Sequence, residues 1–330
     1  MKTFFKVIGI VLLLIVALAA IGVSYLALRK PAQRAASAEK VEATQERIAR
    51  GAYLVKHVTV CFDCHAERTT AYGGPLKPGR EGAGGFIWNK DLGFPGTLAA
   101  ANITPDPETG LGQWTDGEII RAIREGVDRE GNAIFPLMPY GHYSVMSDED
   151  AKAIVTYLRT LQPLRYERPA KSLDVPLNFI EKFIPKPLDG PVSAPDRSNT
   201  VAYGYYLSKI GGCHECHTPK NEKGEPIPGK DLAGGWEMLG PGFRVVTANI
   251  TPHPSNWMGK ATKEEFIARF RAFASFTAAT APPAPPGRNT LMPWITYSGM
   301  TDEDLGALYD YLKTVPPVEN KVNPFPDAKS

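Results

Sequence analysis

Two pentapeptides contain the residues whose types and spacing could do chemistry. Both have the form Cys-x-x-Cys-His, and together they use all four cysteines of the chain. They are Cys61-Phe62-Asp63-Cys64-His65 and Cys213-His214-Glu215-Cys216-His217. Two thiols on one helical turn can each bond covalently to one cofactor, and the adjacent imidazole can then ligate a metal at its centre. The pattern indicates one such site in each half of the chain.

This pentapeptide is typical of c-type haem attachment, with two thioether bonds to the porphyrin and the histidine as a ligand to iron. A zinc ribbon would place its cysteine pairs roughly 15–20 residues apart, and a thioredoxin-like pair would need a surrounding βαβ pattern. Neither alternative fits this chain. We therefore expect two covalently attached haem c groups, with His65 and His217 as ligands to iron.

A low-spin electron carrier needs a sixth ligand to iron, and two pairs of methionines recur in both halves. Met138 and Met292 each lie between a leucine and a proline in a loop, where the side chain is free to point at iron. Met146 and Met300 each precede a serine or threonine that can cap a helix, the position of a hydrophobic staple. We predict that Met138 and Met292 are the ligands and that the other pair is buried.

Asn102 and Asn249 each begin an Asn-Ile-Thr-Pro segment and are further candidates for cofactor binding. Such a polar turn could donate hydrogen bonds to haem propionates, or it could be a structural turn that caps a loop. The sequence leaves both interpretations open. The carbonyl of the Gly74-Pro75 turn is a candidate acceptor for the ring N–H of His65.

Other segments repeat in the same order in both halves, which predicts a tandem duplication. The repeats are Ala101–Pro105 with Ala248–Pro252, Leu137–Tyr140 with Leu291–Trp294, and Tyr143–Asp150 with Tyr297–Asp304. We assign residues 38–162 to a first domain and residues 200–318 to a second. Residues 163–199, which are rich in proline, form the linker.

Each domain is predicted to contain three helices joined by long loops, giving an all-α fold. The first helix covers roughly residues 38–58 in one copy and 200–210 in the other. The middle helices begin at Thr115 and Thr262, each followed three residues later by a glutamate that completes a capping box. The last helices begin at Ser147 and Thr301. In the linker, the apolar residues 177–184 could cover one domain.

Residues 1–30 are predicted to form a signal anchor. Residues 7–28 carry no charge, and as a helix they would span about 33 Å, enough to cross a bilayer. A cleaved signal peptide is the alternative, with Ala17-Leu18-Ala19 or Ala36-Ser37-Ala38 as cleavage sites. The anchor is favoured because the apolar run continues beyond Ala19. Since c-type haem is attached outside the bacterial inner membrane, we expect a cytoplasmic N-terminus and periplasmic haem domains.

Composition excludes some classes of partner. The chain has 330 residues, with 37 Lys plus Arg against 35 Asp plus Glu, a formal net charge of +2. This near-balance argues against a basic nucleic-acid-binding protein, so no nucleic-acid partner is expected. The length suits two domains.

With these motifs the chain resembles c-type cytochromes, specifically the multi-haem cytochrome c subunits of membrane-bound alcohol- and gluconate-type dehydrogenases. In that family a haem domain has Cys-x-x-Cys-His, Asn-Ile-Thr-Pro, a capped amphipathic helix, a Met-Pro-Tyr loop and an acidic start to its closing helix. Members usually have three haem domains and a membrane attachment elsewhere, whereas this chain has two and an N-terminal anchor. The matching residues run from Cys61 to Leu161, and then include Cys213, Asn249, Met292 and Asp302, with Trp294 in place of tyrosine.

The resemblance implies an electron carrier rather than an enzyme. It would relay single electrons in the periplasm from a dehydrogenase or quinol to a soluble cytochrome or an oxidase. A dihaem enzyme, such as a peroxidase or a thiosulfate-oxidising enzyme, is the alternative. Such an enzyme needs an open sixth position on one iron or an unusual ligand such as cysteine. A matched methionine in each half favours the carrier.

Overall fold

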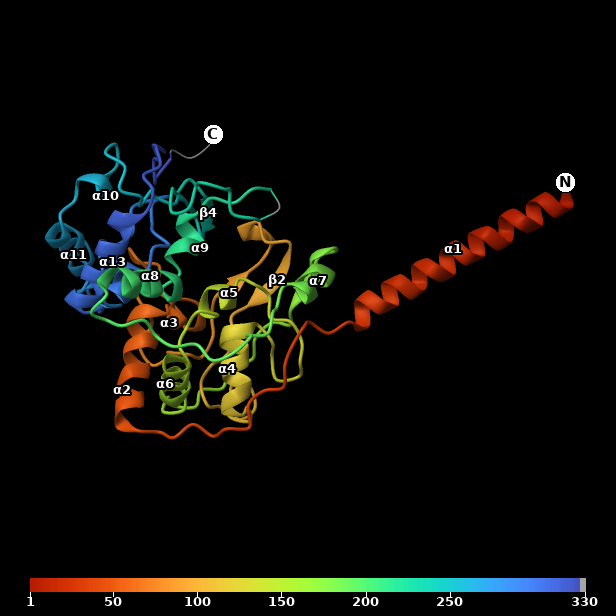
Figure 1. Cartoon of the computed structure of the whole chain (residues 1–330), viewed down its shortest axis with the longest axis horizontal. Helices are drawn as coiled ribbons and strands as arrows, with labels where there is room; N and C mark the ends of the chain where they lie inside the picture. The colour runs from red at the N-terminus through yellow and green to blue at the C-terminus, as the bar shows by residue number, and fades with distance from the viewer. Residues whose placement is uncertain (223, 327–330) are drawn as a thin grey trace.

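The structure is a computed structural model that describes residues 1–222 and 224–326. A long helix, α1 (Lys2–Leu28), projects from a mostly helical body (Figure 1). No residue of α1 is buried, and the structure describes all of them. Within the described residues it is the one helix long and apolar enough to cross a membrane, a property that a signal sequence shares.

The helices of the body follow a similar order in both halves: five recur, whereas a π-helix in the first half and a four-residue helix in the second have no counterpart among the described residues. In the first half they are α2 (Gln45–Tyr53), the π-helix η1 (Leu54–Val58), α3 (Cys61–His65), α4 (Asp116–Glu125), α5 (Tyr140–Tyr143) and α6 (Asp148–Leu158). In the second half they are α8 (Thr200–Ile210), α9 (Cys213–His217), α10 (Trp257–Lys260), α11 (Lys263–Arg271), α12 (Trp294–Tyr297) and α13 (Asp302–Thr314). The predicted helices are present, and α2 begins later than expected because residues 38–43 are not helical and Thr44 is its N-cap.

The predicted all-α fold needs correction, because the described residues also contain short antiparallel strands. One sheet pairs β1 (Ile87–Trp88), β2 (Gly96–Ala99) and β3 (Ser172–Leu173), and another pairs β4 (Glu237–Gly240) with β5 (Phe243–Val246). The turn between β4 and β5 contains Pro241 and Gly242, whose φ of 78° suits the third position of a type II turn. Glycine-rich loops therefore fold back on themselves and satisfy their backbone groups by pairing.

Capping residues fix where the helices begin. At the start of α4 the side chains of Thr115 and Glu118 form a capping box, and Thr262 and Glu265 repeat it at α11. A reciprocal pair of this kind satisfies two backbone N–H groups that the first turn leaves free. The expected helix starts are confirmed at both sites.

The main helix crossing is the same in both halves and depends on glycine. Helix α2 packs on α6 at Gly51, and α8 packs on α13 at Gly204. A Cβ atom at either glycine would lie 1.9 Å from a backbone carbonyl oxygen, that of Ala153 or Ala307. Only glycine allows the helix backbones to approach this closely.

The two halves share one continuous hydrophobic core. Its buried members include Leu54 and Ile154 from the first half and Leu207 and Leu305 from the second. The linker runs over the surface, where β3 joins the sheet of the first half. Its apolar piece forms α7 (Leu177–Ile180) and the 3-10 helix η3 (Glu181–Phe183). Contrary to expectation, Ile180 and Phe183 of this piece are exposed.

Candidate haem sites

Short helices hold the two Cys-x-x-Cys-His motifs. Helix α3 contains the first and α9 the second, and each follows a residue in the left-handed conformation. That residue is Val60, with φ of 47°, in the first half and Gly212, with φ of 72°, in the second. Left-handed backbone is costly for a β-branched residue, so its presence at Val60 marks a turn that the surrounding structure enforces.

The four cysteines are unpaired thiols in a desolvated setting. Burial raises the pKa of Cys61 and Cys216 to about 11 and that of Cys64 and Cys213 to about 12. Activated cysteines have the opposite property, a lowered pKa that favours the thiolate. The four thiols therefore do not have the character of activated nucleophiles.

Both motif histidines are oriented by a backbone carbonyl. The Nδ1 atom of His65 donates to the carbonyl oxygen of Ala101 at 2.7 Å, and that of His217 donates to Ala248 at 2.7 Å. A carbonyl can only accept, so the proton lies on Nδ1 and the lone pair on Nε2. Burial lowers the pKa of both histidines, which keeps the imidazoles neutral. A neutral imidazole fixed in this tautomer fits a haem-iron ligand.

The acceptor for His65 is not the Gly74-Pro75 turn that we expected. The carbonyl oxygen of Gly74 instead accepts from the guanidinium of Arg68 at 2.5 Å. The true acceptor, Ala101, lies 36 positions from His65 in the chain. No local spacing rule links residues so far apart.

A glycine pair that the sequence analysis overlooked closes each site. Ala83-Gly84-Gly85 recurs as Ala233-Gly234-Gly235, and this repeat was the signal that could have found it. The N–H of Gly84 donates to the carbonyl oxygen of His65 at 2.9 Å, and Gly234 does the same for His217 at 2.6 Å. A Cβ atom on Gly234 would lie 2.4 Å from the Ala248 carbonyl group. Each glycine segment thus lies against its motif histidine, and Gly234 also lies close to Ala248, the residue whose carbonyl orients His217.

The candidate methionine ligands differ in burial from their competitors. Met146 and Met300 are 0% and 3% exposed and belong to the core, as predicted. Met138 and Met292 are only partly buried at its edge. Each of these two has the same backbone arrangement, with its carbonyl oxygen accepting at 2.7 Å from the residue that begins α5 or α12. This backbone contact is therefore matched in both halves, although the N–H of Met138 donates to the Phe135 carbonyl and that of Met292 to the Thr290 hydroxyl.

The side chains of Asn102 and Asn249 hold turns together. The Asn102 oxygen accepts from the N–H and hydroxyl of Thr104, and its amide group donates to Thr109 and to the Leu164 carbonyl. The Asn249 oxygen accepts from Thr251 in the same manner, and its amide group donates to the carbonyls of Val318 and Asn320, which follow α13. Both lone pairs and both N–H groups of Asn102 are thereby used within the protein. This network favours the structural interpretation over donation to a propionate.

A tyrosine ties each methionine loop to its haem motif. The hydroxyl of Tyr143 donates to the carbonyl of Thr59, two residues before Cys61. Tyr297 donates to Gly211, two residues before Cys213. Because α5 and α12 contain these tyrosines, the loops just before them are fixed relative to α3 and α9.

The motif helix of each half also contacts the other half. The third residue of the first motif, Asp63, accepts from the hydroxyl of Thr296 at 2.6 Å. The third residue of the second motif, Glu215, bonds His142 Nε2 at 2.9 Å. Thr296 and His142 occupy equivalent positions, four residues after Met292 and Met138. The contacts are thus exchanged between the halves, as in a two-fold symmetric interface.

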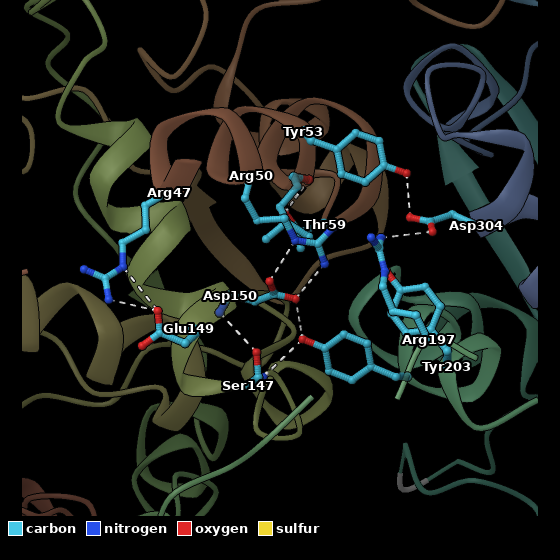
Figure 2. A network of polar contacts seen from close by, with 12 residues as sticks. Arg47, Arg50, Tyr53, Thr59, Ser147, Glu149, Asp150, Arg197, Tyr203 and Asp304 are labelled. Carbon is cyan, nitrogen blue, oxygen red and sulfur yellow. Dashed lines mark hydrogen bonds and ion pairs between the residues drawn. The ribbon is translucent and has the colours of Figure 1, made fainter. Parts of the chain in front are cut away.

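A second exchanged contact involves a tyrosine from each first helix. The Tyr53 hydroxyl donates to Asp304 at 2.7 Å, and the Tyr206 hydroxyl donates to Asp150 at 2.7 Å. Figure 2 shows Tyr53 reaching Asp304 while Arg50 holds Asp150. Burial and the neighbouring carboxylate raise the pKa of both tyrosines well above the usual value. Both hydroxyls therefore stay protonated and donate across the interface.

Comparison with known proteins identifies the family. No family model matches the chain. The chain is 32% identical to a dihaem cytochrome c-type protein of Cereibacter sphaeroides, over 68% of this chain and 73% of that protein. It is 28% identical to the cytochrome c subunit of a quinone-dependent alcohol dehydrogenase of Komagataeibacter europaeus, over 86% of this chain and 59% of that subunit.

Another relative is longer still. The chain is 35% identical to one component of the nicotinate dehydrogenase of Pseudomonas putida, but it spans only 16% of that protein. It therefore covers less than two thirds of several relatives. The similarity fits the neutral, carbonyl-oriented histidines and the desolvated thiols described above. From its sequence and these sites, the chain belongs to the c-type cytochromes, together with a dihaem cytochrome c and the cytochrome c subunits of alcohol, fructose and gluconate dehydrogenases.

Proposed function

We propose that this cytochrome is a tandem duplication that carries two covalent haem c groups and relays single electrons in the periplasm. Its donor would be a dehydrogenase or quinol, and its acceptor a soluble cytochrome or an oxidase. The carrying observation is the matched orientation of His65 and His217 by carbonyl groups at 2.7 Å. Relatives that are cytochrome c subunits of dehydrogenases support a dehydrogenase as the partner.

Cysteines, histidines and methionines would hold the two haem groups. The thioether bonds would form at the four cysteines, Cys61, Cys64, Cys213 and Cys216. His65 and Met138 would ligate iron in the first half, and His217 and Met292 would do so in the second. Bound haem c supplies a one-electron Fe(III)/Fe(II) couple. A methionine sulfur favours Fe(II) and so raises the reduction potential above that of a bis-histidine site. The Nδ1–H bonds keep both imidazoles in the ligating tautomer.

The contacts exchanged between the two halves support electron transfer between the two sites of one chain. It joins α3 to α12 through Asp63 and Thr296, and α9 to α5 through Glu215 and His142. Each motif helix therefore rests on the segment that follows the other half's candidate ligand. The shared core keeps this arrangement rigid.

We further propose that α1 anchors the protein in the bacterial inner membrane, with its N-terminus in the cytoplasm. The residues just after α1 belong to the folded first half. Lys30 Nζ donates to Asn132 at 2.5 Å, and Arg34 pairs with the buried Glu125 at 2.8 Å. These contacts argue against cleavage after Ala38, which would remove them, and the apolar run that continues beyond Ala19 argues against cleavage there. Tethering would raise the effective concentration near other membrane-bound redox proteins.

A redox titration of the full-length protein, followed by optical and electron paramagnetic resonance spectroscopy, tests the relay. We expect two low-spin haems that each take up one electron, and no binding of peroxide to either iron. A ferric high-spin haem that reacts with peroxide would favour the dihaem enzyme instead, because an enzyme needs an open coordination position.

A further inference from the structure

The linker exposes a group of apolar side chains that the electron relay does not explain. Val175, Ile180, Phe183 and Ile184 are 74%, 46%, 51% and 37% exposed. We call these four residues the linker patch. Clustered exposed apolar side chains mark a surface that meets a partner or a membrane.

The linker patch lies against the C-terminal end of α1. Lys182, within the same segment, donates from Nζ to the carbonyl oxygens of Leu26 at 3.1 Å and Ala27 at 2.6 Å. The guanidinium of Arg29 lies 4.4 Å from the centre of the Phe183 ring. The last carbonyls of a helix lack intrahelical partners, so a lysine there is favourable. Figure 1 shows α7 beside this end of α1.

The residues that follow α1 in the chain are also fixed to the body. Gln33 Nε2 donates to the carbonyl oxygen of Gly131 at 3.1 Å, close to the Lys30 and Arg34 contacts already described. The end of α1 is therefore held by two separate segments, the linker and residues 30–34. The linker patch consequently keeps one position relative to α1.

We propose that the linker patch is a second membrane contact, seated in the headgroup region of the leaflet from which α1 emerges. This inference rests on the proposed anchoring by α1. A bilayer that contains α1 must end near Leu28, where the patch begins. Ile180, Phe183 and Ile184 would enter the boundary with the acyl chains.

The surrounding charges fit a lipid surface. Arg29 lies at the edge of the patch, against the Phe183 ring, and Lys186 is exposed two residues beyond Ile184. Cations at this depth pair with lipid phosphates while their aliphatic stems remain among apolar groups. Glu181, the acidic residue within the segment, is buried and paired with Lys171, so it does not oppose anionic lipid. The contact would orient the haem-binding body on the membrane surface rather than let it swing on a tether.

Site-directed spin labelling of the full-length holoprotein tests this proposal. With the native cysteines held in thioethers, a single introduced cysteine would be the one thiol that takes the label. We would compare Ile180→Cys with Leu14→Cys, in the middle of α1, and with Val201→Cys, an exposed position on α8 that is 38% accessible. Each variant would be placed in vesicles of phosphatidylethanolamine and phosphatidylglycerol and probed with oxygen and a water-soluble nickel chelate.

We expect the nickel chelate to reach the Ile180 label several-fold less than the Val201 label, while oxygen reaches it more. If the Leu14 label is shielded but the Ile180 label is as open to nickel as Val201, the patch proposal is overturned and the anchor stands. If the Leu14 label itself meets nickel freely, the anchor fails and the patch proposal fails with it. More than one label per chain would instead show that the thioethers are missing.

Discussion

The expected ligands of each haem and the carbonyls that orient its histidine differ in how far the sequence alone could find them. The motif histidines and the candidate methionines follow from contiguous patterns, because each lies in a short stretch that recurs in both halves. Ala101 and Ala248 also begin a stretch that recurs in both halves, but nothing in that stretch marks their carbonyls as the acceptors, since any residue has a carbonyl group. Only the folded chain shows which one meets the imidazole.

Replacing a candidate ligand should change the iron without changing the fold. We expect Met138→Leu and Met292→Leu each to remove half of the sulfur-to-iron charge-transfer absorption of the ferric protein. Each should also lower the reduction potential of one haem, because methionine ligation favours Fe(II). Visible spectroscopy and redox titration measure both effects.

Met146→Leu and Met300→Leu are the matched controls. Both side chains are buried in the core, and this volume-conserving change should cost less than about 1.5 kcal/mol of stability. The charge-transfer absorption should persist in both. If it is lost in these variants and kept in Met138→Leu and Met292→Leu, the assignment of the ligands is wrong.

Asp231 gives a prediction for acid stability. Hydrogen bonds from His214 and Thr218 lower the pKa of Asp231 to about 2 from its usual 3.8. The carboxylate therefore contributes stability above pH 3.8, and this contribution is lost as the pH falls towards 2. Asp231→Asn should lower the free energy of unfolding at neutral pH by more than it does near pH 2, as measured by denaturant titration. A difference between the two proteins that is independent of pH would contradict this role.

At the scale of helices and strands, capping residues were a better guide than hydrophobic periodicity. Thr115 and Thr262 marked helix starts that the structure confirms. Periodicity placed the start of the first helix too early, because residues 38–43 are not helical and Thr44 caps α2. The short strands escaped prediction since strands of two to four residues contain too little sequence to show alternation.

The helix crossings should not tolerate a side chain on their glycines. We expect Gly51→Ala and Gly204→Ala each to destabilise the protein by about 1–3 kcal/mol or more, because the new methyl group would overlap a carbonyl of the partner helix. Chemical denaturation of the holoprotein measures the change. Val201→Ala, on an exposed position of α8, should shift stability by only about 0.5 kcal/mol. Equal effects at all three positions would argue against a close crossing.

At the scale of the whole molecule, repetition predicted two units but not how they associate. The sequence indicated two domains with a linker between them, and it did not show that the two halves share one core. Tyr53 and Asp304 are 251 positions apart, and no sequence pattern pairs them. Their equivalence to Tyr206 and Asp150 becomes visible only once the halves are folded together.

Breaking the exchanged tyrosine contacts should loosen the two halves. Tyr53→Phe and Tyr206→Phe each remove a hydrogen bond to a buried carboxylate, worth about 1.5–3 kcal/mol. We expect the double variant to unfold in two calorimetric steps where the native protein unfolds in one. Tyr205→Phe, on the exposed side of the same helix, is the control and should unfold as the native protein does. A single step in the double variant would show that the core alone couples the halves.

Counting the haems bound covalently to one chain is the most direct test of the proposed dihaem carrier. Mass spectrometry of the denatured holoprotein, with a pyridine haemochrome assay, should find two haem masses per polypeptide. The variant Cys61→Ala with Cys64→Ala should retain one, and so should Cys213→Ala with Cys216→Ala. A native chain that carries a single haem, or none after expression with a haem-attachment system, would contradict the account.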